Sequence, residues 1–172
     1  MIALGARLRR AATRWKLRRC AEVGEGVRVL GRVWIHGGGT IRVGDRVLLD
    51  GSVSPIELHA GAGAEIVLGA DVRVDGGASL EAARSIAIGE RAHLGCFCKI
   101  LDNHFHRVSS RDQRPVSEPV IVEEDVDLGA RAILLPGARV GRATVVGPGT
   151  VLARRVPAEA LVAGLPATVK RR

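Results

Sequence analysis

Aliphatic residues recur every six positions through the last third of the chain. The residues in this phase are Leu128, Leu134, Val140, Val146 and Leu152. An α-helix repeats its buried face every 3.6 residues and a strand every second residue, so neither element alone produces a period of six. A short strand followed by a tight turn does produce it, if the aliphatic side chain points inward and glycine or a polar residue forms the corner.

The same six-residue unit occurs earlier in the chain. It reads VGDRVL, LGADVR, IGERAH and LGCFCK, and each copy begins with an aliphatic residue followed by glycine. One unit buries too little apolar surface to be stable alone, so the units must stack on one another. Three sides close one triangular coil, and the coils pile into a prism. The sequence therefore predicts an all-β fold, a parallel β-helix of hexapeptide repeats.

The composition fits a narrow core. Aromatic residues make up 2% of the chain, with no tyrosine, whereas glycine contributes 22 of the 172 residues. A thin prism accommodates Val, Ile, Leu and Ala but few large rings. The three cysteines, Cys20, Cys96 and Cys98, form no even disulfide framework and suit a reducing compartment. We expect Cys96 and Cys98 to be strand residues, with Cys98 in a small core position.

The first 20 residues form a separate basic segment. Its apolar residues recur at helical spacing between arginines, and they are Leu4, Leu8, Ala11, Ala12 and Trp15. This amphipathic helix could cap the open end of the core or touch an anionic membrane surface. Arginines interrupt every apolar run, so the pattern fits neither a signal peptide nor a membrane-spanning helix. We expect a cytoplasmic protein, with peripheral contact at the inner face of the membrane as an option for the helix.

The net charge of +8 comes from the two ends of the chain. Residues 7–19 hold seven basic side chains and no acidic one, and residues 170–172 hold three more. Removing these ten positive charges from +8 leaves −2 for the rest of the chain. The body is therefore not a basic surface, and we expect no nucleic-acid partner.

Hexads of the form aliphatic-Gly-x-x-x-x resemble the left-handed β-helix of the hexapeptide-repeat acyltransferases. The ending LLPGARVGRATVVGPGTVLARRVPAEALVAGLPATVKRR is similar to the last coils and tail of that family, and the resemblance spans about residues 23–172. Beside the basic helix that the spacing predicts at 1–20, the resemblance implies a left-handed β-helix acyltransferase domain with a C-terminal tail at 21–172. It also implies a homotrimer that binds acetyl-CoA in a groove between neighbouring prisms.

A long interruption of the hexads follows residue 101. After ILDNHFH the phase is lost through RVSSRDQRPVSEP, which predicts an extruded loop at about residues 102–119. Acyl transfer from a thioester to a hydroxyl needs a base that is neutral near pH 7, and histidine is such a base. DNHFH resembles the Asp-x-x-Phe-His start of this loop in sugar O-acetyltransferases of the family. The resemblance assigns the catalytic base to His106, or to His104 in a shifted alignment.

Three further loop residues have two interpretations each. Asp102 could orient the imidazole or accept a hydrogen bond from a sugar hydroxyl, or it could only form the turn beside Asn103. Arg111 and Arg114 could bind an acidic or phosphorylated acceptor, although most loop arginines are simply solvated.

The resemblance also implies residues that bind the acyl donor. Those expected to offer backbone groups to the pantetheine arm are Gly129, Ala130, Gly147 and Pro148. Arg154 and Arg171 would meet the nucleotide phosphates. The chain departs from the family at Asp127, where tryptophan is common, and at Ala153 and Arg154, where a Thr-Lys pair is common.

These features predict an acetyl-CoA-dependent O-acetyltransferase that acts by direct transfer on a hydroxyl of a sugar or glycan precursor, without a metal. Two alternatives remain open. A γ-type carbonic anhydrase uses the same prism and a zinc ion held by three histidines, and the histidines of this chain are His36, His59, His93, His104 and His106. A His-x-His pair in one loop suits that site poorly. The other alternative is a non-catalytic scaffold that binds a membrane or an acidic partner through its basic helix.

Overall fold

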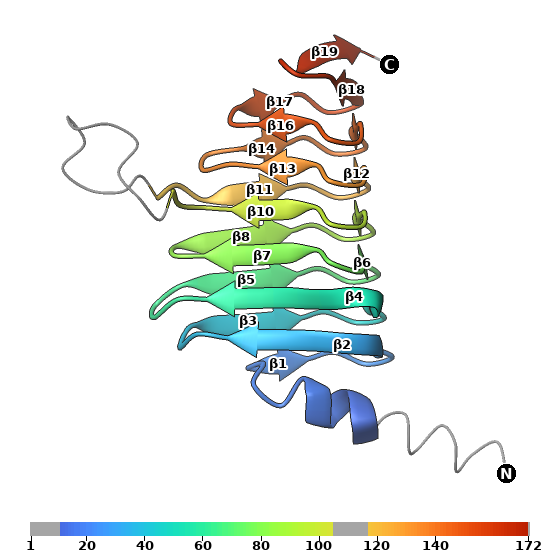
Figure 1. Ribbon diagram of the computed structural model, residues 1–172, viewed down its shortest axis with the longest axis vertical. Coiled ribbons are helices and arrows are strands. Elements are labelled where there is room, and N and C mark those ends of the chain that lie inside the picture. Colours follow the sequence, from blue (N-terminus) through green and yellow to red (C-terminus); the bar gives the residue numbers. More distant parts are fainter. Residues whose placement is uncertain (1–10, 105–116, 172) are drawn as a thin grey trace, which may run out of the picture.

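The computed structural model describes residues 11–104 and 117–171. Apart from a short helix at residues 11–16, the regular structure in these residues is β-strand. The strands stack in parallel columns along one axis, with the helix at one end and the C-terminal strands at the other (Figure 1). The predicted all-β fold, a left-handed parallel β-helix of hexapeptide repeats, is confirmed.

Three faces form the prism. The first face consists of β1 (Glu22–Val23), β3 (Thr40–Val43), β5 (Glu65–Leu68), β8 (Ser85–Ile88), β11 (Val120–Val122), β14 (Arg139–Val140) and β17 (Arg155–Val156). The second consists of the first halves of β2 (Arg28–His36) and β4 (Leu48–Ala60), then β6 (Arg73–Asp75), β9 (His93–Leu94), β12 (Asp127–Leu128), β15 (Val145–Val146) and β18 (Ala160–Ala163). The third consists of the second halves of β2 and β4, then β7 (Ser79–Ala82), β10 (Lys99–Leu101), β13 (Ile133–Leu134) and β16 (Val151–Leu152). The last strand, β19 (Thr168–Arg171), pairs antiparallel with β18.

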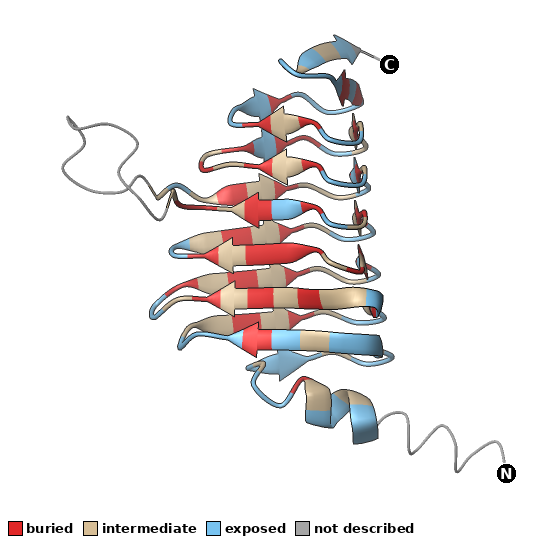
Figure 2. Cartoon of the chain, viewed as in Figure 1, coloured by how far each residue is buried: buried red, intermediate tan, exposed pale blue. Residues whose placement is uncertain are grey.

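The six-residue repeat marks the inward positions. Leu128, Leu134, Val140, Val146 and Leu152 are each at most 1% exposed. Buried residues run through the coils from β4 upward, whereas β2 and the helix at the base are largely exposed (Figure 2). Cys98 fills a core position as expected, and burial raises the pKa of its thiol to about 12. The prediction that Cys96 and Cys98 are strand residues is wrong, because both lie at the corner between β9 and β10. The core is therefore aliphatic, as the low aromatic content requires.

The helix closes the base differently from the sequence prediction. Trp15, which helical spacing places on the apolar stripe, is 67% exposed, whereas Leu17 is 1% exposed and belongs to the core. The reason is that the helix ends at residue 16, so the side chain that follows it enters the open end of the prism. Within residues 11–20, the side chains that contact the core are Leu17 and, partly buried, Cys20.

Candidate functional site

The predicted loop at about residues 102–119 falls between β10 and β11, and the structure describes its two ends, residues 102–104 and 117–119. Its neck is closed by an antiparallel bridge between Asn103 and Ser117. The backbone N–H of Glu118 also donates to the carbonyl oxygen of Asp102, at 2.8 Å. The chain therefore leaves and rejoins the coil at neighbouring points, and the coils above and below the loop stay in register: Lys99 and Ile133 are paired directly.

Asp102 is a structural residue of this neck. Its carboxylate is fully buried and accepts two short hydrogen bonds, from the backbone N–H groups of Ala83 and Arg84, both at 2.6 Å. The side-chain amide of Asn103 donates to the same carboxylate at 3.1 Å. A buried charged group needs such donors, and here they fix the corner of the preceding coil. The geometry favours the turn-forming interpretation over a direct contact with a sugar.

Of the two candidate bases, the structure describes His104 but not His106. His104 is half-buried and directly follows the residues of the neck. His106, Arg111 and Arg114 lie outside the described residues. The neck thus places the start of the DNHFH motif at the edge of the third face, next to β10.

The residues predicted to contact the pantetheine arm lie at the corner between the second and third faces. Gly129 and Gly147 occupy equivalent positions in successive coils, and their amides donate to the carbonyls of Val146 and Val162, each at 2.7 Å. These two amides belong to the ladder between coils, so they are not free for a ligand. The amide of Ala130 has no hydrogen-bond acceptor within residues 11–104 and 117–171.

Pro148 explains why a glycine stands at position 129. A Cβ added to Gly129 would lie 2.7 Å from the nitrogen of Pro148 in the next coil, which is closer than real Cβ contacts. The corner glycines that the sequence resemblance assigns to the donor thus also have a structural function, the close stacking of coils. The exposed Ala130 amide is open to a ligand, but the equivalent corner amides of Ala70, Glu90 and Cys96 also have no backbone acceptor among the described residues.

Arg154 lies at the C-terminal end of the third face. Its guanidinium is exposed and donates one hydrogen bond to the carbonyl of Ala167, at 3.0 Å. Together with Ala153 and Pro166 it lines an open pocket of about 320 Å³. Because a guanidinium has five N–H donors, most of its donors remain for a phosphate. For Arg171 the structure describes the backbone in β19 but not the side chain.

These elements surround one surface. The loop neck lies at one edge of the third face, the Gly129–Ala130 corner lies at the other edge, and the Arg154 pocket lies toward the C-terminal end. Lys99, Ile133 and Val151 are in register across the strands between them and are at least partly exposed. We call this surface, from β10 to β16, the upper third face. It is the candidate site for an acyl donor and an acceptor.

A polar cluster centred on His93, which was not predicted from the sequence, lies on the second face. The two ring nitrogens of His93 are 2.9 Å from carboxylate oxygens of Asp127 and of Asp75, and Arg73 donates to Asp75 at 2.8 Å. Burial acts to raise the pKa of Asp75, but the hydrogen bonds from His93 and Arg73 outweigh it, and the pKa is lowered. With both nitrogens bonded, His93 is poorly suited to act as a free base.

The described histidines do not converge on one point. His36 and His59 are neighbours on the third face, with ring centroids 6.5 Å apart, whereas His93 lies on the second face. In the described segments, no group of three or more His, Cys, Asp or Glu side chains is arranged to hold a metal ion. The structure of the single chain thus gives the carbonic anhydrase alternative no support.

No protein-family model matches the chain. A stretch of 55 residues, 32% of this chain, is 49% identical to 2,3,4,5-tetrahydropyridine-2,6-dicarboxylate N-acetyltransferase of Staphylococcus aureus (strain JH9). The stretch covers 23% of that enzyme, so the chain matches about a quarter of the length of its curated relative. The similarity is therefore local.

Solved structures share the fold over almost the whole chain. A hexapeptide-repeat acetyltransferase from Vibrio cholerae, complexed with acetyl coenzyme A, covers 94% of this chain and 76% of its own, with a TM-score of 0.61 and 22% identity. A mutant of AntD, an N-acyltransferase from Bacillus cereus in complex with dTDP and coenzyme A, covers 93% and 89%, with a TM-score of 0.77 and 17% identity. At these identities the likeness establishes the left-handed β-helix itself. Within the described residues, no helix is long and apolar enough to cross a bilayer.

Proposed function

We propose that the protein is an acyltransferase that uses acetyl-CoA as donor. The observation that carries the proposal is the arrangement of the upper third face: the neck of the loop between β10 and β11 borders one edge, and the exposed Ala130 amide borders the other. Long loops in compact repeats usually serve function. The solved relatives with acetyl coenzyme A or coenzyme A bound have the same fold.

The proposed mechanism is direct transfer with His106 as general base. The acceptor oxygen attacks the thioester carbon while His106 takes the hydroxyl proton. The C–O bond forms, the C–S bond breaks, and the CoA thiolate takes up the proton as it leaves. The Ala130 amide is suited to donate a hydrogen bond near the thioester, and Arg154 to a phosphate of the nucleotide. His104 is the alternative base. No covalent acyl-enzyme is required.

The proposed acceptor is a hydroxyl of a sugar or glycan precursor. An amine is the second candidate, because the Staphylococcus aureus relative is named an N-acetyltransferase and AntD an N-acyltransferase. Release of free CoA thiol from acetyl-CoA, measured with a panel of nucleotide sugars, free glycans and amino sugars, distinguishes them. The proposal predicts turnover with hydroxyl acceptors. Turnover with amino sugars alone would favour the amine, and no turnover with any acceptor would favour the scaffold.

We also propose that the working unit is a homotrimer. The upper third face of one chain is open, and the Arg154 pocket is no deeper than a surface hollow, so a second prism beside it would complete the donor groove. Light scattering on the purified protein tests this directly. A trimer is expected, whereas a monodisperse active monomer would contradict the shared groove.

A further inference from the structure

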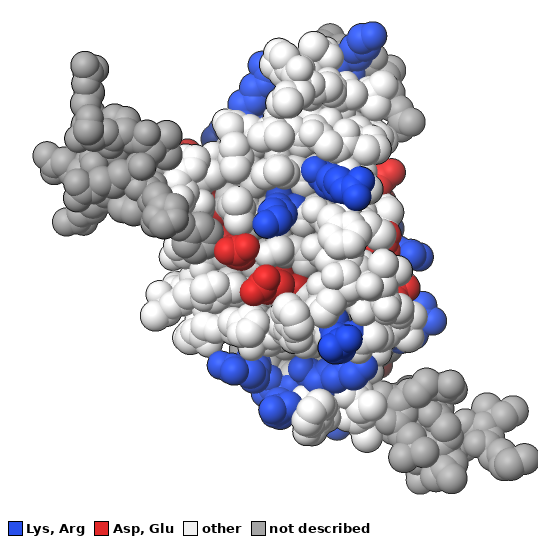
Figure 3. Space-filling view, in the orientation of Figure 1, with Lys and Arg blue, Asp and Glu red and all other residues white. Residues whose placement is uncertain are grey.

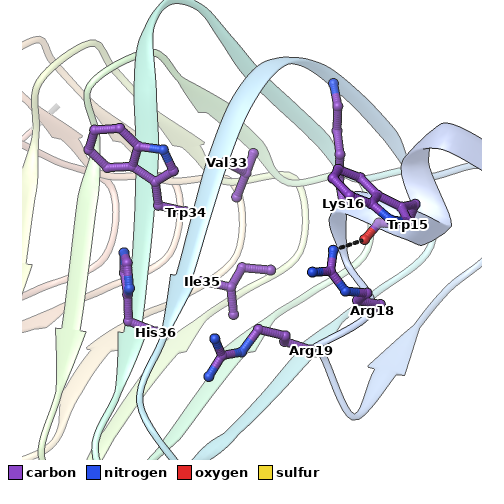
Figure 4. Close-up of a pocket in the computed structure, with 8 residues that line it drawn as sticks. All are labelled: Trp15, Lys16, Arg18, Arg19, Val33, Trp34, Ile35 and His36. Atoms are coloured by element: carbon purple, nitrogen blue, oxygen red, sulfur yellow. Dashed lines mark hydrogen bonds between the residues drawn. The ribbon is translucent and has the colours of Figure 1, made fainter.

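A second surface lies at the opposite end of the third face. Trp15 from the helix and Trp34 from β2 flank an open pocket, which we call the basal pocket (Figure 4). They are the only two tryptophans in the chain, and they are 67% and 49% exposed. Large aromatic side chains normally bury most of their surface, so two exposed rings in a chain with so few aromatics need an explanation.

The basal pocket also gathers positive charge. Lys16, Arg18 and Arg19 line it, and each donates to a backbone carbonyl oxygen, at 2.7, 3.1 and 3.4 Å. Within the described part of the chain, none of the three pairs with a carboxylate. By contrast, Arg46 and Arg91 higher in the prism pair with aspartates at 2.7 Å. Three uncompensated cations on one surface favour an anionic partner.

The cations and the rings are held together. The Arg18 guanidinium stacks 4.6 Å from the centroid of the Trp15 ring, and Lys16 is tied to the backbone of β2. In the space-filling view, lysine and arginine side chains cover the base of the molecule, and acidic side chains lie only above them on the same face (Figure 3). The basal pocket therefore combines clustered positive charge with two exposed indole rings.

We propose that the basal pocket docks the protein on an anionic phospholipid surface. A free phosphate would be satisfied by the cations alone. A bilayer also gives the two indole rings the environment they prefer, an apolar layer beside polar headgroups. The attraction between basic side chains and anionic lipid supplies about fivefold in affinity for each charge. This proposal is independent of the acyltransferase function.

The two tryptophans provide the readout. Because the chain has no tyrosine and no other tryptophan, its indole fluorescence reports only the basal pocket. On titration with vesicles of phosphatidylcholine and phosphatidylglycerol, we expect cosedimentation and a blue shift of the emission. Vesicles of phosphatidylcholine alone should give neither. The double variant Arg18→Gln, Arg19→Gln should bind the anionic vesicles about 30-fold more weakly.

Arg155→Gln, Lys170→Gln is the matched control. It removes two exposed positive charges at the other end of the prism and should bind within about twofold of the native protein. Equal thermal unfolding midpoints would show that both double variants are folded. The proposal is overturned if the control loses as much binding as the basal variant, or if both kinds of vesicle bind equally. It is also overturned if inorganic phosphate shifts the emission while vesicles do not, because the partner would then be a soluble anion.

Discussion

The carboxylate of Asp102 satisfies two backbone amides in the interior of the loop neck, and its removal should therefore affect stability first. Asp102→Ala leaves both N–H groups without an acceptor, and we expect it to lower the free energy of unfolding by about 2–4 kcal/mol. Asp102→Asn keeps one acceptor oxygen and should lose about half as much. Urea unfolding measures both. An unchanged stability with a raised KM for the acceptor would instead support a sugar-binding aspartate.

Asp75 should make part of the stability of the folded protein depend on pH. Its pKa is lowered in the folded chain, so its ionised form stabilises the fold above the unfolded pKa of about 4, and this contribution disappears as pH falls through the lower folded value. Asp75→Asn should therefore be less stable than the native protein at pH 7, and the difference should shrink as pH falls below about 4. Urea unfolding between pH 3 and pH 7 tests this. A difference that is constant with pH would show that the pairing with His93 and Arg73 contributes nothing.

The corner glycines test the stacking of the coils. Gly129→Ala would place a Cβ 2.7 Å from the Pro148 nitrogen, whereas a Cβ at Gly38 would have no neighbour within 4 Å. We expect Gly129→Ala to cost about 1–3 kcal/mol of stability and Gly38→Ala to leave it nearly unchanged. Thermal unfolding of the two variants provides the comparison. Equal effects would mean that the corner relaxes and that Gly129 is there for the donor instead.

At the level of the elements, the sequence predicted the inward residues but not every corner. The six-residue period alone identifies Leu128 and Leu134 as buried residues, because one short strand and one turn make up the whole repeat. The corners at Arg46 and Asp71 take positive φ values of 55° and 58° without glycine. Their amides donate to the preceding coil at 2.7 and 2.8 Å, and this contribution becomes visible only when the coils are stacked.

The cluster around His93 shows the same limit. His93 and Asp127 are 34 residues apart, but they pair directly in adjacent coils, because the loop adds residues without adding a coil. Without the register, nothing in the sequence links the two. The tryptophan pair was missed for a similar reason: the apolar stripe left open whether Trp15 faces the core or a membrane, and Trp34 comes from a strand on which no site was predicted.

At the scale of the whole molecule, the third face of the prism has a different candidate binding surface at each of its two ends. The basal pocket occupies the N-terminal end of the third face, and the upper third face lies toward the C-terminal end, beside the loop neck. The sequence predicted the loop because it interrupts the hexads, and the donor corner because its glycines recur at a fixed position in them. It could not show that they border the same surface, since that depends on which side of the coil each corner occupies.

The most direct test of the acyltransferase account replaces the two loop histidines separately. His106→Ala should lower kcat by about two to four orders of magnitude with a nearly unchanged Kd for CoA, because a general base acts in the transition state. His104→Ala should cost far less, and the native rate should fall as pH drops through about 6.5. Equal and small losses in both variants, with an unaltered pH profile, would contradict the assignment of the base to this loop.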